Sequence, residues 1–341
     1  MKLSRRQFCS VAFTAPALAA QSAPPPPLID RGFGRVSKLA EGVYVTIANP
    51  EKGPQCLSNG GIIVGRERIL LVEGHFQAAG AALEVEAART ISKAPILAAI
   101  NTHYHLDHTF GNRGYAERHI AIMAHESAPG LMKERYAALQ GADKAPLLAS
   151  AQRKIDEAAD PREKKHLQSD LGADQWMYGA IDSTTLAYPT ELLTSEQLPK
   201  RIELGGIDAV IESHPGHTPT DLIIRIPDRD IVFTGDLLFY GAYPVAFDAD
   251  MMACRKILDI FLSYSPKTRF IPGHGPVCGM EVVRQQIDLM DDLRAHAEKM
   301  IHAGIALDEA KRSYTIPARF REFGVTSWNW TIGAAVESYY R

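Results

Sequence analysis

Residues 103–108 read His-Tyr-His-Leu-Asp-His and directly follow a short apolar run. If the chain stays extended, His103, His105 and Asp107 point to one side, because strand side chains alternate. If a helix begins after His105, then His105 and His108 come together instead. Either geometry brings imidazoles and a carboxylate to one point at the end of a strand. The run therefore predicts a metal site and requires a fold that can build one.

Three further residues of the same types stand in Gly- or Pro-rich segments after apolar runs. They are His217 in Pro-Gly-His-Thr, Asp236 in Thr-Gly-Asp, and His274 in Pro-Gly-His-Gly. Strand ends deliver such side chains to one edge of a sheet. Each segment alone is typical of an ordinary turn. Together with residues 103–108, they indicate a single centre.

The pattern of strands and helices predicts a layered α/β protein. Short β-branched runs, typical of strands, occupy residues 43–47, 61–64, 69–72, 96–100, 201–204, 209–211, 222–226 and 231–233. Helical segments are predicted over residues 78–91, 127–179, 253–264, 280–303 and 327–339. This order favours two α/β halves stacked sheet on sheet with helices outside. We expect one domain over residues 36–341, with a helical insertion at about 127–190.

The N-terminus has the features of an export signal. Arg5 and Arg6 belong to a basic start, an apolar run follows, and Ala17-Leu18-Ala19 fits the small-x-small cleavage pattern. The paired arginines resemble the twin-arginine signal, which carries proteins already folded. We therefore expect residues 1–19 to be removed and a Pro-rich linker over 20–35. The mature protein is expected in the periplasm or secreted, with no membrane association, because the apolar run is too short to span a bilayer.

The charge balance excludes a dedicated nucleic-acid binder, which needs a basic field. The chain has 37 basic and 40 acidic residues, a net charge of -3, and loss of three basic groups with the signal leaves -6. A small-molecule substrate is the expected partner. Cys56, Cys254 and Cys278 remain in an oxidising compartment. The sequence leaves open whether any of them pair, and it leaves the oligomeric state open.

The motif T-H-x-H-x-D-H at residues 102–108, followed by G-H-T, G-D and G-H-G, resembles that of the metallo-β-lactamase superfamily of metal-dependent hydrolases. The resemblance implies an αββα sandwich of two stacked mixed sheets with helices outside, and two Zn²⁺ ions at one edge, with iron or manganese as alternatives. The first ion would be held by His103, His105 and His217, the second by Asp107, His108 and His274, and Asp236 would bridge them. A hydroxide shared by the two metals would be the nucleophile. Asp107 and Asp236 would be its catalytic carboxylates.

An aspartate at position 236 makes the ligand set closer to glyoxalase II, lactonase and phosphodiesterase-type relatives than to dedicated β-lactamases. A carbonyl substrate is favoured: an ester, lactone, thioester or lactam. Three alternatives remain open. They are a β-lactamase acting on antibiotics, a mononuclear iron sulfur dioxygenase of the same fold, and an exported binding protein without activity. Metal content separates the dioxygenase, because zinc is redox-silent.

The surroundings of the metals are predicted from the neighbouring loops. Residues 51–58 are expected to lie over the site, and an aromatic substrate wall is expected from Phe239, Tyr240, Tyr243 and Phe247. Trp176, in the predicted helical segment 127–179, is expected to contact substrate from above the cleft. Glu73 stands where relatives usually carry an aspartate, so it is expected behind the ligands, and His75 is expected to approach the metals.

Overall fold

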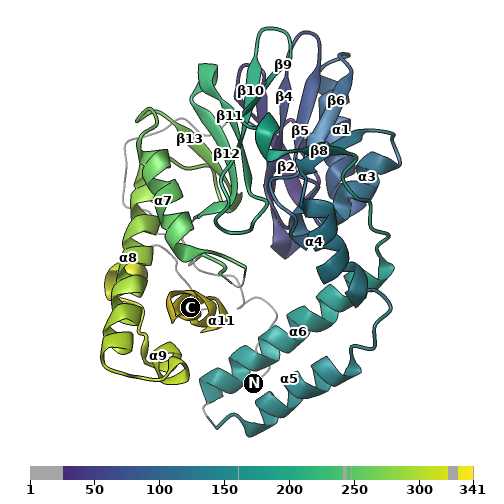
Figure 1. Cartoon of the computed structure of the whole chain (residues 1–341). Helices are drawn as coiled ribbons and strands as arrows, with labels where there is room; N and C mark the ends of the chain where they lie inside the picture. Colours follow the sequence, from purple (N-terminus) through teal and green to yellow (C-terminus); the bar gives the residue numbers. More distant parts are fainter. Residues whose placement is uncertain (1–25, 160, 241–243, 247, 322–328, 341) are drawn as a thin grey trace.

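In the computed structural model of this chain, the described residues are 26–159, 161–240, 244–246, 248–321 and 329–340 (Figure 1). Two sheets lie face to face at the centre. The first runs in chain order through β1 (Ile29–Asp30), β2 (Gly34–Ala40), β3 (Val43–Ala48), β4 (Gly60–Val64), β5 (Ile69–Val72), β6 (Ile96–Ile100), β7 (Ala121–His125) and β8 (Glu191–Leu193). The second has the order β13 (Arg269–His274), β12 (Ile231–Phe239), β11 (Leu222–Ile226), β10 (Asp208–Ser213) and β9 (Lys200–Glu203).

Both sheets are mixed, as predicted. Strands β1 to β5 are antiparallel neighbours, and β5 to β8 are parallel. Strands β9 to β12 are antiparallel, and β12 pairs with β13 in parallel. The ligand-type residues follow β6, lie in β12 and at the end of β13, and, for His217, lie in the loop between β10 and β11.

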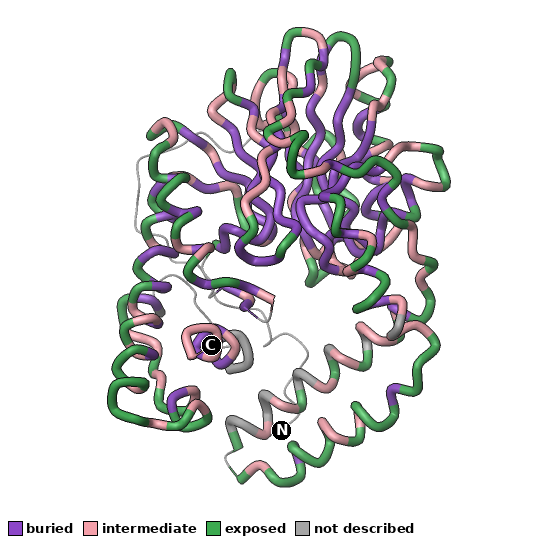
Figure 2. Tube along the Cα trace, in the orientation of Figure 1, coloured by how far each residue is buried: buried purple, intermediate pink, exposed green. Residues whose placement is uncertain are grey.

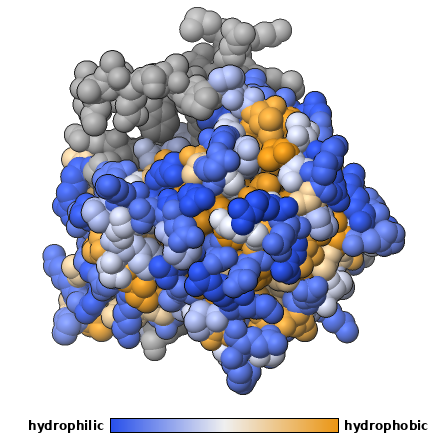
Figure 3. Space-filling view, turned by 90° about the horizontal axis from the view of Figure 1, so that it is seen from above, coloured by the Kyte–Doolittle hydropathy of each residue, from blue (hydrophilic) through white to orange (hydrophobic). Residues whose placement is uncertain are grey.

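Strand β5 shows why its residues alternate between two cores. All of its side chains are buried, but Leu70 and Val72 pack between the sheets while Ile69 and Leu71 pack on the outer side. A strand that is covered on both faces has no solvent side, so its sequence is continuously apolar. Figure 2 shows the buried residues concentrated in the two sheets, and seen from above the surface is mostly hydrophilic with scattered apolar patches (Figure 3).

Helices cover the outer faces of the sandwich, which confirms the predicted fold class. On the first sheet they are α1 (Ala78–Ile91) and α3 (Arg113–Ala116), and on the second α7 (Met251–Leu262), α8 (Met280–His302) and α11 (Asn329–Tyr340), with α9 (Leu307–Ser313) and α10 (Ala318–Arg321) between α8 and α11. None of the described helices combines the length and apolar composition needed to cross a bilayer.

Between β7 and β8 the chain leaves the sheets and forms helices, which we call the helical insertion. It contains α4 (Ala128–Arg135), a 3₁₀ turn at Ala137–Leu139, α5 (Ala145–Glu157) and α6 (Pro161–Ser183). Helices α5 and α6 pack together and extend away from the sandwich (Figure 1). Helix α4 is docked on the sandwich, because Ala128 and Met132 are buried in a cluster with Phe76 and Phe110.

The structure differs from the sequence prediction at some strand boundaries. The first sheet begins at Ile29, inside the range 20–35 expected to be a linker, because Ile29 pairs with Val36 of β2 and packs on the outer core. Strands β1, β2, β7, β8 and β13 were not predicted. Asp236 and His274 lie within β12 and at the end of β13 rather than in turns. Strand β12 continues through Thr234, Gly235 and Asp236, and all of its residues are buried.

Candidate metal centre

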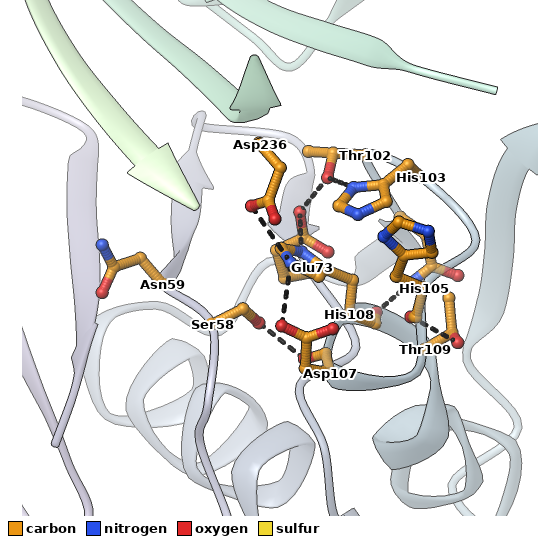
Figure 4. Close-up of polar contacts among 12 residues, drawn as sticks. Ser58, Asn59, Glu73, Thr102, His103, His105, Asp107, His108, Thr109 and Asp236 are labelled. Atoms are coloured by element: carbon orange, nitrogen blue, oxygen red, sulfur yellow. Dashed lines mark hydrogen bonds and ion pairs between the residues drawn. The ribbon is translucent and has the colours of Figure 1, made fainter. Parts of the chain in front are cut away.

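The seven predicted ligand residues come together at one edge of the sandwich, and Figure 4 labels His103, His105, Asp107, His108 and Asp236 among them. They form three overlapping groups whose ligand atoms lie within 4.8 Å of one another: His103 with His105 and His217, His103 with His108 and Asp236, and Asp107 with His108 and His274. The segment after β6 stays non-helical to His105, and helix α2 (Leu106–Thr109) begins there. Both local geometries considered from the sequence therefore occur, one after the other.

Gly235 lets β12 approach the β6 loop. Its φ is +51°, and a Cβ atom at this position would lie 2.6 Å from the hydroxyl oxygen of Thr102. The pairing of β12 with β13 is irregular on both sides of Gly235. Any larger residue would therefore separate Asp236 from His103.

The first ligand group has two imidazole nitrogens facing each other without a proton between them. His217 donates from Nδ1 to the carbonyl of Val245 at 2.9 Å, and the Nε2 atom of His105 lies 3.0 Å from a carboxylate oxygen of Asp248. With those protons placed, Nε2 of His217 and Nδ1 of His105 are both acceptors, yet they lie 3.0 Å apart. Two lone pairs at this distance repel unless a cation lies beside them. The Nε2 atom of His103 is buried and has no hydrogen-bond partner among the described residues.

The second group places imidazoles against carboxylates. His274 donates from Nδ1 to the carbonyl of Leu57 at 3.0 Å, and its Nε2 atom lies 3.2 Å from Asp107 and 3.4 Å from Asp236. The Nε2 atom of His108 lies 3.4 and 3.3 Å from the same two carboxylates. This arrangement attracts positive charge, whether a proton or a metal ion.

The pKa values of the histidines differ between the two groups in the same way. Burial lowers the pKa of His217 to about 3, with the neighbouring imidazoles acting in the same direction. Burial also lowers the pKa of His103. In contrast, the charges of Asp236 and Asp107 outweigh burial and raise the pKa of His274 to about 10. Without metal, His103 and His217 therefore stay neutral, whereas His274 holds a proton where a cation would bind.

Glu73 lies behind a ligand, as expected. One of its carboxylate oxygens accepts a hydrogen bond from the hydroxyl of Thr102 and lies 3.2 Å from Nδ1 of His108. A carboxylate at this position fixes which nitrogen of His108 carries the proton. His75 is placed differently from the expectation. It is fully buried, and its nitrogens lie 3.1 Å from the carbonyl of Ser58 and 3.2 Å from Glu84, so it belongs to none of the three ligand groups.

The sequence analysis missed the close contacts of the segment 57–59. The carbonyl of Leu57 holds His274, and the hydroxyl of Ser58 donates to the carbonyl of Asp107 at 2.8 Å. The amide of Asn59 donates to the carbonyls of Pro272 and Gly275 at 2.9 and 2.6 Å. This segment joins the two halves of the site. The sequence indicated these contacts only through the prediction that residues 51–58 lie over the site.

Asp248 was also missed. Its carboxylate contacts His105, Tyr104 and Arg135, and although burial opposes the change, these hydrogen bonds lower its pKa. A pocket of about 380 Å³ lies beside this cluster, lined by Tyr104, Leu131, Glu134, Arg135, Pro219 and Asp248. No sequence signal points to Asp248, because its partners are more than a hundred positions away.

The predicted aromatic wall is only partly covered by the described residues. Tyr240 is 36% exposed and packs beside Gly275, next to His274. The ring of Phe239 lies 5.9 Å from that of His217 and 6.1 Å from that of His274, centre to centre. Tyr243 and Phe247 lie outside the described residues, as does the side chain of Trp176, whose backbone belongs to α6.

Comparisons with known proteins agree with this geometry. A family model described as the metallo-beta-lactamase superfamily matches residues 53–274. Uncharacterized proteins of Mycobacterium bovis and Mycobacterium tuberculosis are 35% identical over 95 residues, which is 26% of this chain. The match covers only 42% of the length of these curated relatives.

Among solved structures, a metallo-beta-lactamase from Pontibacter korlensis superposes with a TM-score of 0.55 at 16% identity, covering 76% of this chain and 99% of its own. A stereoselective inverting sec-alkylsulfatase from a Pseudomonas species superposes with a TM-score of 0.63 at 17% identity, covering 89% of this chain and 49% of its own. At these identities the likeness shows the fold alone.

Proposed function

This chain belongs to the metallo-beta-lactamase superfamily, and on that premise we propose that it is an exported hydrolase that uses two divalent cations, zinc foremost, to cleave a carbonyl substrate. The proposed substrate class is an ester, lactone, thioester or lactam. The observation that carries the proposal is the convergence of imidazole nitrogens and carboxylate oxygens from seven residues within the three ligand groups. Such a donor set suits zinc.

In this proposal, His103, His105 and His217 hold the first cation, and Asp107, His108 and His274 hold the second. Asp236 serves both. One of its oxygens lies 3.3 Å from Nε2 of His108, and the other lies 3.5 Å from His217 and 3.4 Å from His274. The position of this carboxylate between the two groups supports a bridging role.

When bound, two such cations lower the pKa of a shared water towards neutrality and polarise the substrate oxygen. The chain prepares the site for them. Glu73, Asp248 and the carbonyls of Leu57 and Val245 each contact the outer nitrogen of one imidazole, so that its inner nitrogen presents a lone pair. Phe239 covers the rings of two ligand histidines and restricts water there.

Cys254 and Cys278 do not offer an alternative nucleophile. Cys254 and Cys278 are buried, and burial raises the pKa of Cys278 to about 12. A thiol with such a pKa is protonated at neutral pH and reacts slowly. Burial also raises the pKa of Cys254. This supports a water nucleophile over covalent catalysis.

Export is part of the proposal, and its basis is the sequence of residues 1–19, which lie outside the described part of the chain. Mass spectrometry of protein from the periplasmic fraction is expected to give a mature N-terminus near residue 20. Replacing Arg5 and Arg6 by lysine is expected to block export. An intact Met1 on exported protein contradicts this part.

Metal analysis combined with a hydrolysis panel tests the activity. The purified mature protein is expected to contain about two zinc ions per chain. The panel contains esters, lactones, thioesters and β-lactams, with a phosphodiester and a secondary alkyl sulfate added, the latter because one structural neighbour is described as an alkylsulfatase. One iron and no zinc favours the sulfur dioxygenase, cleavage of β-lactams alone favours a β-lactamase, and two metals with no turnover favours a binding protein.

A further inference from the structure

The carboxylate of Asp248 lies on the outer side of His105. Its Oδ2 atom is 3.0 Å from Nε2 of His105 and also accepts the hydroxyl proton of Tyr104. A carboxylate beside Nε2 keeps the proton of the His105 ring on that nitrogen, so that Nδ1 is unprotonated and directed at His217. Asp248 therefore determines both the tautomer and the ring orientation of one ligand.

Asp248 is itself held by Arg135. The Nη1 atom of Arg135 lies 2.5 Å from both carboxylate oxygens of Asp248 and 3.2 Å from the hydroxyl of Tyr104. This arginine is the last residue of α4 and so belongs to the helical insertion rather than to either sheet. One guanidinium thus fixes both groups that contact the outer face of His105.

Apolar packing fixes the position of α4. Met132 is fully buried, and the ring of Tyr136, directly after Arg135, lies 5.4 Å from Phe110 and 6.1 Å from Tyr104, centre to centre. Phe110 directly follows helix α2, which carries Asp107 and His108. Since the neighbours of Arg135 are packed against the ligand-bearing segment, its side chain is delivered to a defined place.

The segment that carries Asp248 also holds a second ligand of the same group. The carbonyl of Val245 accepts from Nδ1 of His217, and the backbone nitrogen of Asp250 donates to the carbonyl of Gly216 at 2.8 Å. The outer contacts of the other group come from elsewhere: Glu73 contacts His108, and Leu57 contacts His274. The two groups therefore have separate supports.

We propose that the helical insertion is a positioning element for one cation site only: Arg135, acting through Asp248, sets the orientation of His105 and so the affinity of the group formed by His103, His105 and His217. The inference rests on the proposed function for the two cations. Arg135 is a positioning residue, because it acts on the ligand through another side chain. The group of Asp107, His108 and His274 keeps its affinity when Arg135 is changed.

Zinc binding tests this inference without any need for turnover. The mature protein is stripped of metal, and Zn²⁺ is titrated in competition with a chromophoric chelator, which resolves ions of different affinity. In Arg135→Met, one of the two ions is expected to bind about tenfold to a hundredfold more weakly, as for other outer contacts of metal ligands, and the other is expected to be unchanged. Arg135→Lys keeps a positive charge and is expected to restore part of the loss. Asp248→Asn is expected to weaken the same ion.

Arg201→Met is the matched control, because Arg201 pairs with Asp208 on β9 and β10, outside the ligand groups. It is expected to change neither ion. Thermal unfolding of the metal-free proteins reports whether Arg135→Met is folded. If it is not folded, the zinc affinities of Arg135→Lys and wild type are compared to test the inference. Unchanged affinities, or equal weakening of both ions, overturn this inference alone. A wild-type protein that binds fewer than two ions overturns the proposed function as well.

Discussion

The two sheets contribute to the site in different ways. The first sheet supplies four of the proposed ligand residues within residues 103–108, whereas the second supplies His217, Asp236 and His274, one from each of three separate segments. In the first half, a strand end followed by one helical turn is sufficient to make the ligands converge. In the second half, only correct pairing of β10 to β13 brings them together. The first half of the site forms within one continuous segment, whereas the second half forms only when the strands of the second sheet pair.

The hydrogen bonds that hold the two halves of the site differ in the same way. In the first half, the side-chain amide of Asn101 donates to the carbonyl of His108 at 2.9 Å, seven positions along the chain. In the second half, the loop of His217 closes on the buried carboxylate of Asp221, which accepts from the hydroxyl of Thr218 at 2.6 Å and from the backbone of Gly216 at 3.1 Å. That carboxylate determines where the loop places its histidine.

The largest effect is expected for the one ligand that faces both groups. Asp236→Ala removes the oxygens next to His108, His217 and His274, so both cations are expected to lose affinity, and kcat is expected to fall by more than the 10- to 100-fold typical of outer-shell changes. Elemental analysis and turnover measure the result. Two retained ions with near-normal kcat would show that Asp236 does not bridge, and β-lactams would then move to the top of the substrate panel.

The second prediction compares the supports of the two halves. Asp221→Ala leaves the buried backbone N–H of Thr218 without an acceptor, which costs about 1–3 kcal/mol, and it removes one of the two acceptors of the Gly216 N–H. The free energy of unfolding by urea is expected to fall accordingly, with weaker zinc binding by His217. Asn101→Ala is the counterpart in the first half, and a smaller loss is expected there because the covalent link through α2 remains. A larger loss for Asn101→Ala would reverse the comparison.

A smaller effect is expected at the rim. Tyr240→Ala removes a half-exposed ring beside Gly275 and leaves every proposed ligand in place. A severalfold rise in KM or a changed ranking of substrates is expected with little change in kcat, because lost uniform binding weakens ground state and transition state together. Steady-state kinetics on the substrate panel measures both constants. Lost metal in this variant would contradict its assignment to the rim.

The smallest effect concerns sheet pairing away from the ligands. Glu212 on β10 accepts a hydrogen bond from Arg225 at 2.6 Å and lies 3.1 Å from His214, and although burial opposes the change, these partners lower its pKa. Because the folded-state pKa is below the unfolded value, the stabilisation is present above about pH 4.3 and is lost as the pH falls through the folded-state pKa. The pair is partly exposed, so less than about 1 kcal/mol is expected.

Urea unfolding of metal-free protein at pH 6 and pH 3.5 tests this prediction. The difference in stability between wild type and Glu212→Gln is expected to shrink at the lower pH, where the wild-type carboxylate is protonated as well. Metal-free protein is used because protons also displace metal from imidazoles. A difference that grows on acidification would mean that the carboxylate destabilises β10.

Much of the fold could be predicted, because its strands and helices have local signatures. The apolar β-branched runs and the helical periodicity predicted most of the central strands and long helices, but β1, β2, β7, β8 and β13 were missed. Strand β13 reads Arg-Phe-Ile-Pro-Gly-His, and its proline and glycine mimic a turn. Parallel pairing with β12 nevertheless keeps this segment in the sheet, and that pairing depends on the tertiary structure.

The sequence by itself predicted which residues come together, because His103, His105, Asp107 and His108 lie within six positions at a strand end, where either local geometry brings some of them to one side. Only the tertiary structure decided what holds those ligands. The contact of Asp248 with His105 spans 143 positions, and that of Asp248 with Arg135 spans 113. Hydrogen bonds between residues so far apart leave no periodicity or spacing in the chain, since they exist only after the sheets have paired and the helical insertion has packed against them.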